Sequence, residues 1–120
     1  YIQYAHARCC SIMRRFEDEI TSINTEVLKY LKENSEKKII GKLIEFPEVV
    51  VKSAEILEPQ SICTYLSELS ALFHSYYAKN KVIDLENREL TEARIYLVNS
   101  IRIVIQNGLS ILGVSYPSKM

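Results

Sequence analysis

The stretch that decides the fold reads RELTEARIYLVNSIRIVIQNGLSIL and spans residues 88–112. Its apolar side chains recur every three or four residues: Leu90, Ala93, Leu97, Ile101, Val104, Ile105 and Leu112. This spacing is typical of a helix, because positions three and four apart share one helix face. The apolar positions cover more than one face, so we expect this helix at the centre of a helical bundle. Gly113 suits the left-handed residue that ends a helix, and Pro117 prevents its continuation.

The rest of the chain predicts four more helices, over residues 1–20, 35–45, from Pro47 onward and 59–79, with a short helical turn at 25–31. Pro47 fits a first helical position, where its missing N–H is not needed. The predicted buried positions of these later helices are Ile39, Ile40, Leu43 and Ile44; Val50, Ala54 and Leu57; and Ile62, Leu66, Leu69, Phe73 and Tyr76. No segment alternates strictly as a half-buried strand would. The prediction is one all-α domain, residues 1–120, built as a bundle of about five helices.

Composition limits the possible functions. The 120 residues carry 15 basic and 15 acidic side chains, and this zero net charge counts against a free-standing nucleic-acid binder. No apolar run is long enough to span a membrane, and three cysteines, two of them adjacent, favour a reducing cytoplasm over a disulfide framework. His6 and Cys10 lie four residues apart, but two ligands do not make a metal site, so we expect none.

The first helix begins YIQYAHARCCSIMRR, residues 1–15, and shows two stripes. The apolar stripe consists of Ile2, Ala5, Cys9, Ile12, Phe16 and Ile20. The second stripe consists of Tyr1, Tyr4, Arg8, Ser11 and Arg15. Aromatic rings and guanidinium groups on one ridge suit unpaired bases and their phosphates. The same residue types also occur on ordinary solvated helix faces, so spacing alone leaves a helical protein-interaction domain open.

The order of these residues resembles the start of the anticodon-binding domain of arginyl-tRNA synthetases, which reads Y-x-Q-Y-x-H-[AS]-R. The resemblance continues through FPEVV at 46–50, EP at 58–59, F-x-x-Y-Y at 73–77 and N-G-L-x-x-L-G-x-x-x-P-x-x-M at 107–120. It covers essentially the whole chain. It implies the C-terminal domain of a class I synthetase, cut just after the catalytic domain and ending at Met120.

In that family this domain, called the DALR domain, is a helical bundle that grips the anticodon stem and loop. The resemblance implies that Tyr1 and Tyr4 bracket loop bases and that Arg8 anchors phosphate or pairs within the loop. It also implies that Tyr76 stacks near the middle base and that Met120 lies beside them. Arginine activation with ATP and magnesium would belong to the upstream catalytic domain, and we find no catalytic residue or cofactor motif in this chain.

Arginine codons share a middle guanine, so arginine anticodons carry cytosine there. Backbone groups of the turn-rich segment GVSYPSKM, residues 113–120, could pair with that cytosine. The chain departs from the family at Ser118-Lys119, where glutamate and arginine are usual, and at Gln60-Ser61, where a more basic pair is often seen. The alternatives are a protein-interaction domain without an RNA role and the equivalent domain of another class I synthetase, such as the cysteinyl enzyme. We expect His6 to serve packing or hydrogen bonding and His74 to be exposed or bridging.

Overall fold

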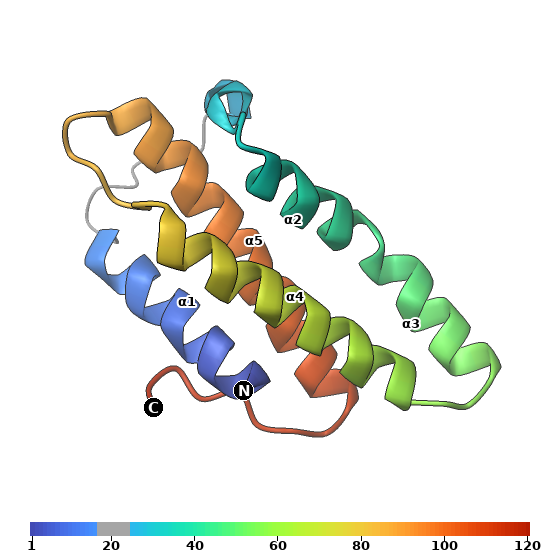
Figure 1. The fold of residues 1–120 in the computed structure, drawn as a ribbon. Coiled ribbons are helices and arrows are strands. Elements are labelled where there is room, and N and C mark those ends of the chain that lie inside the picture. Colours follow the sequence, from blue (N-terminus) through green and yellow to red (C-terminus); the bar gives the residue numbers. More distant parts are fainter. Residues whose placement is uncertain (17–24) are drawn as a thin grey trace.

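The computed structural model of the chain describes residues 1–16 and 25–120, and this part is built of helices (Figure 1). In chain order they are α1 Ile2–Phe16, the 3-10 helix η2 Thr25–Tyr30, α2 Asn34–Ile44, α3 Phe46–Glu55, α4 Gln60–Lys79 and α5 Arg88–Ile111. No strand occurs within the described residues, so the prediction of an all-α bundle of about five helices is confirmed. Pro47 is the second residue of α3, one position later in the helix than predicted but still in its first turn, and Gly113 adopts a φ of 72° as predicted. The predicted end of the first helix at Ile20 lies outside the described residues.

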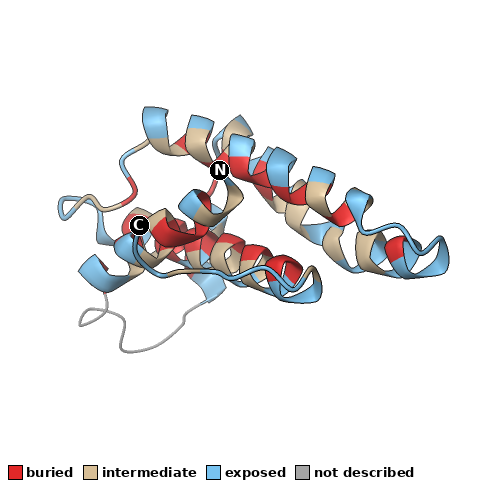
Figure 2. Ribbon diagram, turned by 90° about the horizontal axis from the view of Figure 1, so that it is seen from below, coloured by how far each residue is buried: buried red, intermediate tan, exposed pale blue. Residues whose placement is uncertain are grey.

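Helix α5 lies at the centre of the bundle, as its apolar pattern predicts. It packs against α1, η2, α2 and α4, and Ala93, Ile101 and Ile105 on it are completely buried. At Gly108 an added Cβ would lie 2.7 Å from the side-chain carbons of Leu66, which is itself fully buried on α4. Glycine therefore permits the close approach of α4 and α5. Figure 2 shows the buried residues along the sides of the helices that face one another.

The predicted buried faces of α2 and α3 are partly wrong. Ile44 is 72% exposed and Leu57 87% exposed, and Ala54 is exposed as well, whereas Ser53 is the buried residue of α3. Among the described elements, helix α3 packs mainly against α4 and α2 and extends away from α1 and α5 (Figure 1), so one narrow side of it is covered. The side toward α4 carries Ser53, whose hydroxyl donates to the carbonyl of Glu58 at 2.7 Å. A small polar residue therefore occupies the buried position, and the apolar residues around it remain exposed.

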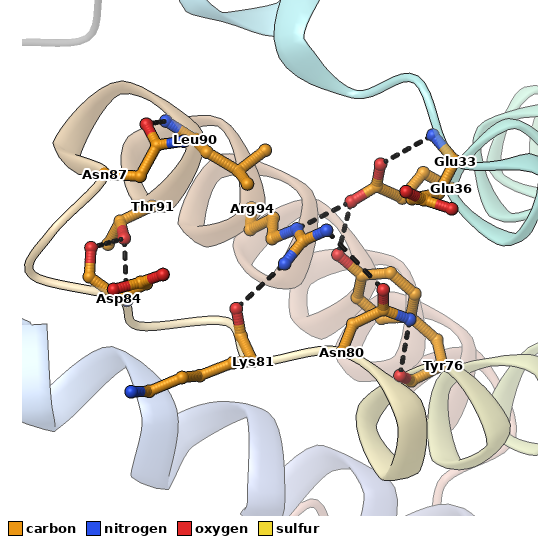
Figure 3. A network of polar contacts seen from close by, with 10 residues as sticks. All are labelled: Glu33, Glu36, Tyr76, Asn80, Lys81, Asp84, Asn87, Leu90, Thr91 and Arg94. Carbon is orange, nitrogen blue, oxygen red and sulfur yellow. Dashed lines mark hydrogen bonds and ion pairs between the residues drawn. The ribbon is translucent and has the colours of Figure 1, made fainter.

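A buried polar network joins α2, α4 and α5 (Figure 3). The Glu36 carboxylate is completely buried and accepts from Arg94 Nε at 2.9 Å and from the Tyr76 hydroxyl at 2.5 Å. Its other oxygen accepts from the backbone N–H of Glu33 at 3.0 Å, and Arg94 Nη1 donates to the carbonyl of Lys81 at 2.9 Å. A buried charge is tolerated only when it is paired and hydrogen-bonded, and both conditions hold here. The network fixes the C-terminal end of α4 against the rest of the bundle.

Candidate nucleic-acid interface

The second stripe predicted on the first helix is present on the surface of α1. Tyr1, Tyr4, Ser11 and Arg15 are exposed and Arg8 is half-buried. Each residue turns a helix by about 100°, so the spacing of these five positions places them together on one side of the helix. This side is next to the one that carries the core-facing stripe. The stripe therefore presents aromatic and basic groups to solvent along one ridge.

Arg8 is held between two aromatic rings from different helices. Its Cζ lies 5.0 Å from the centroid of the Tyr4 ring and 5.1 Å from that of Tyr77 on α4. Arg8 Nη2 donates to the Tyr4 hydroxyl at 2.9 Å, and Arg15 Nη2 donates to the Tyr77 hydroxyl at 3.0 Å. Cations within about 6 Å of a ring face are attracted by the electron density of that face. Two rings and two guanidinium groups thus form one preorganised cluster across α1 and α4.

This cluster borders an open pocket of about 430 Å³, formed by α1, the end of α4 and the C-terminal tail, residues 113–120. The lining residues are Tyr4, Ala7, Arg8, Ser11, Ile12, Arg14, Arg15, Tyr77, Lys119 and Met120. The lining includes basic side chains and, among the described residues that form it, no acidic one. The chain as a whole is neutral, and the basic side chains among the described residues of this lining supply the local positive charge that phosphate binding needs.

The structure brings together three of the five predicted site residues. Tyr4, Arg8 and Met120 all line the pocket, although Met120 is far from the other two in sequence. Tyr1 does not line it. Its ring lies 5.2 Å from that of His74, and Tyr4 lies 5.7 Å from the same imidazole. Tyr1 is therefore at the rim of the site, 67% exposed, on the same ridge.

The prediction that Tyr76 stacks on a base needs correction. Tyr76 is only 1% exposed, and its hydroxyl is bound to Glu36 inside the polar network. Burial and the neighbouring Glu36 carboxylate raise the pKa of the phenol, which stays protonated as a donor. The ring belongs to the apolar stripe of α4 that includes Leu69 and Phe73, and a buried ring cannot receive a nucleotide.

Tyr77, one residue further along α4, takes the place predicted for Tyr76. It is half-buried, lines the pocket and stacks on Phe73 with ring centroids 5.9 Å apart and planes 16° apart. The F-x-x-Y-Y motif contained the signal that distinguishes the two tyrosines. Tyr76 follows the apolar repeat of α4, whereas Tyr77 leaves it by about 100° and points toward α1.

His74 supports the tyrosines of α1 from the side of α4. Its ring contacts Tyr1, Tyr4 and also Phe73, whose centroid is 5.5 Å away, so the prediction of a bridging residue is confirmed. The Nε2 atom is buried without a hydrogen-bond partner among the described residues. Burial, followed by the nearby Arg8 cation, lowers the pKa of His74. The neutral imidazole is therefore favoured beside Arg8.

His6 has the hydrogen-bonding role predicted for it. It is 2% exposed, and its Nδ1 lies 3.0 Å from the carbonyl oxygen of Pro117 in the tail. Within the described ranges, no three His, Cys, Asp or Glu side chains gather closely enough to hold a metal ion. No described helix has the length and apolarity to cross a membrane.

This all-helical bundle carries, between its first helix and its C-terminal tail, the aromatic and basic side chains that suit nucleic-acid binding. A family model described as the DALR anticodon binding domain matches residues 2–120, and the chain belongs to this family.

Its relatives are arginine–tRNA ligases. The enzyme of Desulforamulus reducens is 44% identical over 126 aligned positions, and that of Listeria welshimeri is 39% identical over 121. Each alignment covers 100% of this chain and 22% of the relative. Among solved structures, the arginyl-tRNA synthetase of Thermus thermophilus matches with a TM-score of 0.85 at 30% identity, over 100% of this chain and 21% of its own. The chain thus spans about a fifth of the length of these relatives.

Proposed function

We propose that this chain recognises the anticodon loop of arginine tRNA as part of an arginine–tRNA ligase. One observation supports this most strongly: Tyr4 and Arg8 from α1, Tyr77 from α4 and Met120 from the tail line a single positively charged pocket. Its volume of about 430 Å³ falls within the range of roughly 300–1,000 Å³ that is usual for pockets accepting small organic groups. An extruded nucleobase is such a group. Exposed aromatic faces bind unpaired bases by stacking, whatever their sequence.

Each side chain of the pocket has a distinct role in this proposal. A loop base stacks on the exposed ring of Tyr4 or on Tyr77, and Arg8 holds both rings ready because it lies between them. Arg15 and Lys119 at the rim neutralise phosphates of the loop. The rings are positioned by protein contacts before RNA arrives, so little conformational freedom is lost on binding.

The middle anticodon base is the one that every arginine tRNA shares, and it is cytosine. Its recognition requires an acceptor for the exocyclic amine and a donor for the ring nitrogen or carbonyl oxygen. Lys119 and Met120 line the pocket, and their backbone offers both kinds of group. Replacing the middle cytosine by uracil reverses this pattern and should weaken binding clearly.

The remaining four-fifths of such an enzyme would carry out the chemistry. We expect attachment of arginine to its tRNA, with ATP and magnesium, to take place in a catalytic domain of the same protein, in the cytoplasm. The present chain would hold the tRNA at the anticodon and position it for that reaction. The relatives at 44% and 39% identity described above are named arginine–tRNA ligases, which favours an arginine enzyme over a cysteinyl one.

One observation favours the alternative of a protein-interaction domain. A second pocket, of about 300 Å³, lies between η2, α2 and α5, and its lining is mostly apolar: Leu28, Leu31, Ile40, Leu43, Ile44, Tyr96, Leu97 and Ser100. Such a surface suits a protein contact better than an RNA. It does not overlap the lining of the basic pocket, so the two sites can be tested separately.

A salt titration of binding to an arginine tRNA anticodon stem-loop distinguishes these functions. If three or four cations contact phosphates, the logarithm of the affinity should fall with the logarithm of salt with a slope of about −2 to −3. Lys119→Gln should make that slope shallower by about 0.7. The matched control is Lys38→Gln, which changes an exposed lysine on α2 and should leave the slope unchanged. Affinity that does not depend on salt, or no binding, would contradict the proposal.

A further inference from the structure

The C-terminal tail is attached to α1 by a row of three side chains, of which Arg14 also lines the pocket. Gln3 Nε2 donates to the carbonyl of Ser115 at 2.8 Å, and Arg14 Nη1 donates to the carbonyl of Ser118 at 3.1 Å. Between them His6 Nδ1 lies 3.0 Å from the carbonyl oxygen of Pro117. Tail residues therefore meet α1 residues in parallel order, and the tail lies alongside α1 in Figure 1. We call Gln3, His6 and Arg14 the tail clasp.

The tail depends on this clasp for its position. Its backbone bonds to α5 end early, with the N–H of Gly113 to Ser110 and that of Val114 to Leu109. In the described structure, the hydrogen bonds beyond Val114 all come from side chains of α1. Most tail residues are exposed, so little apolar burial holds them. An extended segment with few contacts is disordered unless specific bonds offset its lost entropy.

His6 is the central and most buried member of the clasp. Its ring also contacts Tyr116 edge-on, with centroids 5.7 Å apart. On its other side Nε2 lies 3.4 Å from Oε1 of Gln106 on α5, and that oxygen accepts from Arg102 at 3.1 Å. The imidazole is thus fixed between α5 and the tail. With its proton on Nδ1, it donates to Pro117, which offers a carbonyl oxygen and no N–H. Nε2 then carries no proton, so in this tautomer its approach to Gln106 Oε1 is a packing contact and not a hydrogen bond.

Gln3 and His6 do not line the pocket, whereas Arg14 both bonds the tail and lines the pocket. Gln3, His6 and Arg14 are spaced i, i+3 and i+11, which places them within one side of the helix. Tyr4 and Arg8 lie on a neighbouring side, nearer to α4. The last clasped residue, Ser118, directly precedes Lys119 and Met120, which line the pocket.

We propose that Gln3, His6 and Arg14 are positioning residues, which hold the tail along α1 so that Lys119 and Met120 form one wall of the anticodon pocket. This rests on the proposed function. His6 is buried, so it cannot contact RNA itself and can affect binding only through the tail. Its effect on binding must therefore vanish when the end of the tail is absent.

A double-mutant cycle on the 120-residue chain tests this dependence. His6→Ala should raise the Kd for the arginine anticodon stem-loop about three- to tenfold, the range expected for one hydrogen bond. In a chain lacking residues 119–120, the same substitution should change the Kd less than twofold. His6→Asn, whose amide can donate near the position of Nδ1, should bind within about twofold of the parent.

A readout without RNA separates the clasp from the proposed function. In ¹⁵N relaxation measurements, the amides of Ser118 and Met120 should become mobile in His6→Ala and stay ordered in His6→Asn. Gln3→Ala should give the same result even if His6→Ala fails to fold, because Gln3 is only half-buried. The matched control is Asn107→Ala, an exposed change on α5.

Four results would overturn the inference; the first two are these. One is an equal loss of affinity from His6→Ala with and without residues 119–120, which would mean that His6 acts through the helix. The other is a tail that stays ordered in both His6→Ala and Gln3→Ala. A parent chain that does not bind the stem-loop refutes the proposed function and this inference with it, whereas loosening of the tail with unchanged affinity refutes the inference alone.

Discussion

Tyr76 and Tyr77 are adjacent in sequence and should respond to substitution in opposite ways. Tyr76 is 1% exposed and donates to the completely buried Glu36 carboxylate. Tyr76→Phe removes only that hydroxyl. Because a buried hydrogen bond to a charged group contributes about 1.5–3 kcal/mol, the free energy of unfolding should fall by about that amount. Tyr76→Ala also leaves a cavity and should cost about 3–5 kcal/mol.

Tyr77 is half-buried, so its loss should affect RNA binding more than folding. Tyr77→Ala removes a ring on which a base can stack, and it also removes one of the two rings between which Arg8 lies. Stacking of a base on an aromatic side chain contributes about 1–3 kcal/mol, which raises the Kd roughly 5- to 150-fold. Tyr77→Phe keeps the ring and loses only the bond from Arg15, so it is the matched control with a small effect.

Two measurements on the same samples distinguish the structural role of Tyr76 from the RNA-binding role proposed for Tyr77. Urea denaturation followed by far-ultraviolet circular dichroism gives the free energy of unfolding, and fluorescence anisotropy at fixed salt gives the Kd for the anticodon stem-loop. We expect Tyr76→Phe to be destabilised with a Kd close to that of the parent wherever it remains folded. The reasoning is refuted if Tyr76→Phe loses affinity without losing stability, or if Tyr77→Ala binds like the parent.

Two further predictions concern the buried groups. Replacing Glu36 with alanine leaves Arg94 as an uncompensated buried charge, so urea denaturation should show a loss of about 3–5 kcal/mol, and a loss below about 1 kcal/mol would contradict the pairing. The pKa of His74 is lowered by burial and by Arg8, so the unfolded chain binds more protons than the folded chain just below the ordinary value of about 6.5. The stabilising contribution of this pKa difference is therefore fully present above that pH. It is lost as the pH falls toward the lower pKa that His74 has in the folded chain. In His74→Phe the decline measured between pH 7 and pH 5 should be smaller than in the parent, and an equal decline would count against a buried neutral imidazole.

The helices could be predicted from the sequence because their signals are local. The apolar repeat of residues 88–112 is the one that packs at the centre, and Gly113 takes the left-handed conformation that its position suggests. Pro47 and Pro59 likewise mark real helix starts. Each of these features depends on residues within a few positions, so periodicity and turn chemistry suffice.

The errors arose where a residue's environment depends on distant parts of the chain. Ile44 and Leu57 fit an apolar repeat, but Ile44 is the last residue of α2 and Leu57 lies beyond the end of α3, and both side chains remain exposed. The environment of Tyr76 depends on its hydrogen bond to Glu36, 40 positions away, and no local pattern predicts that pairing. The tail clasp is the clearest example, because Gln3 bonds a residue 112 positions later. Tyr4 and Arg8 were predictable because one helix ridge displays both.

The pocket formed by α1, the end of α4 and the tail is the proposed binding site for RNA. Chemical-shift mapping of the ¹⁵N-labelled chain during titration with the arginine anticodon stem-loop locates the binding surface residue by residue. We predict that the largest amide shifts fall on Ser11, Tyr77 and Met120 around the basic pocket, while Ile40 and Leu43 at the apolar pocket keep their positions. Largest shifts at Ile40 and Leu43, with Ser11 and Tyr77 unmoved, would contradict the account.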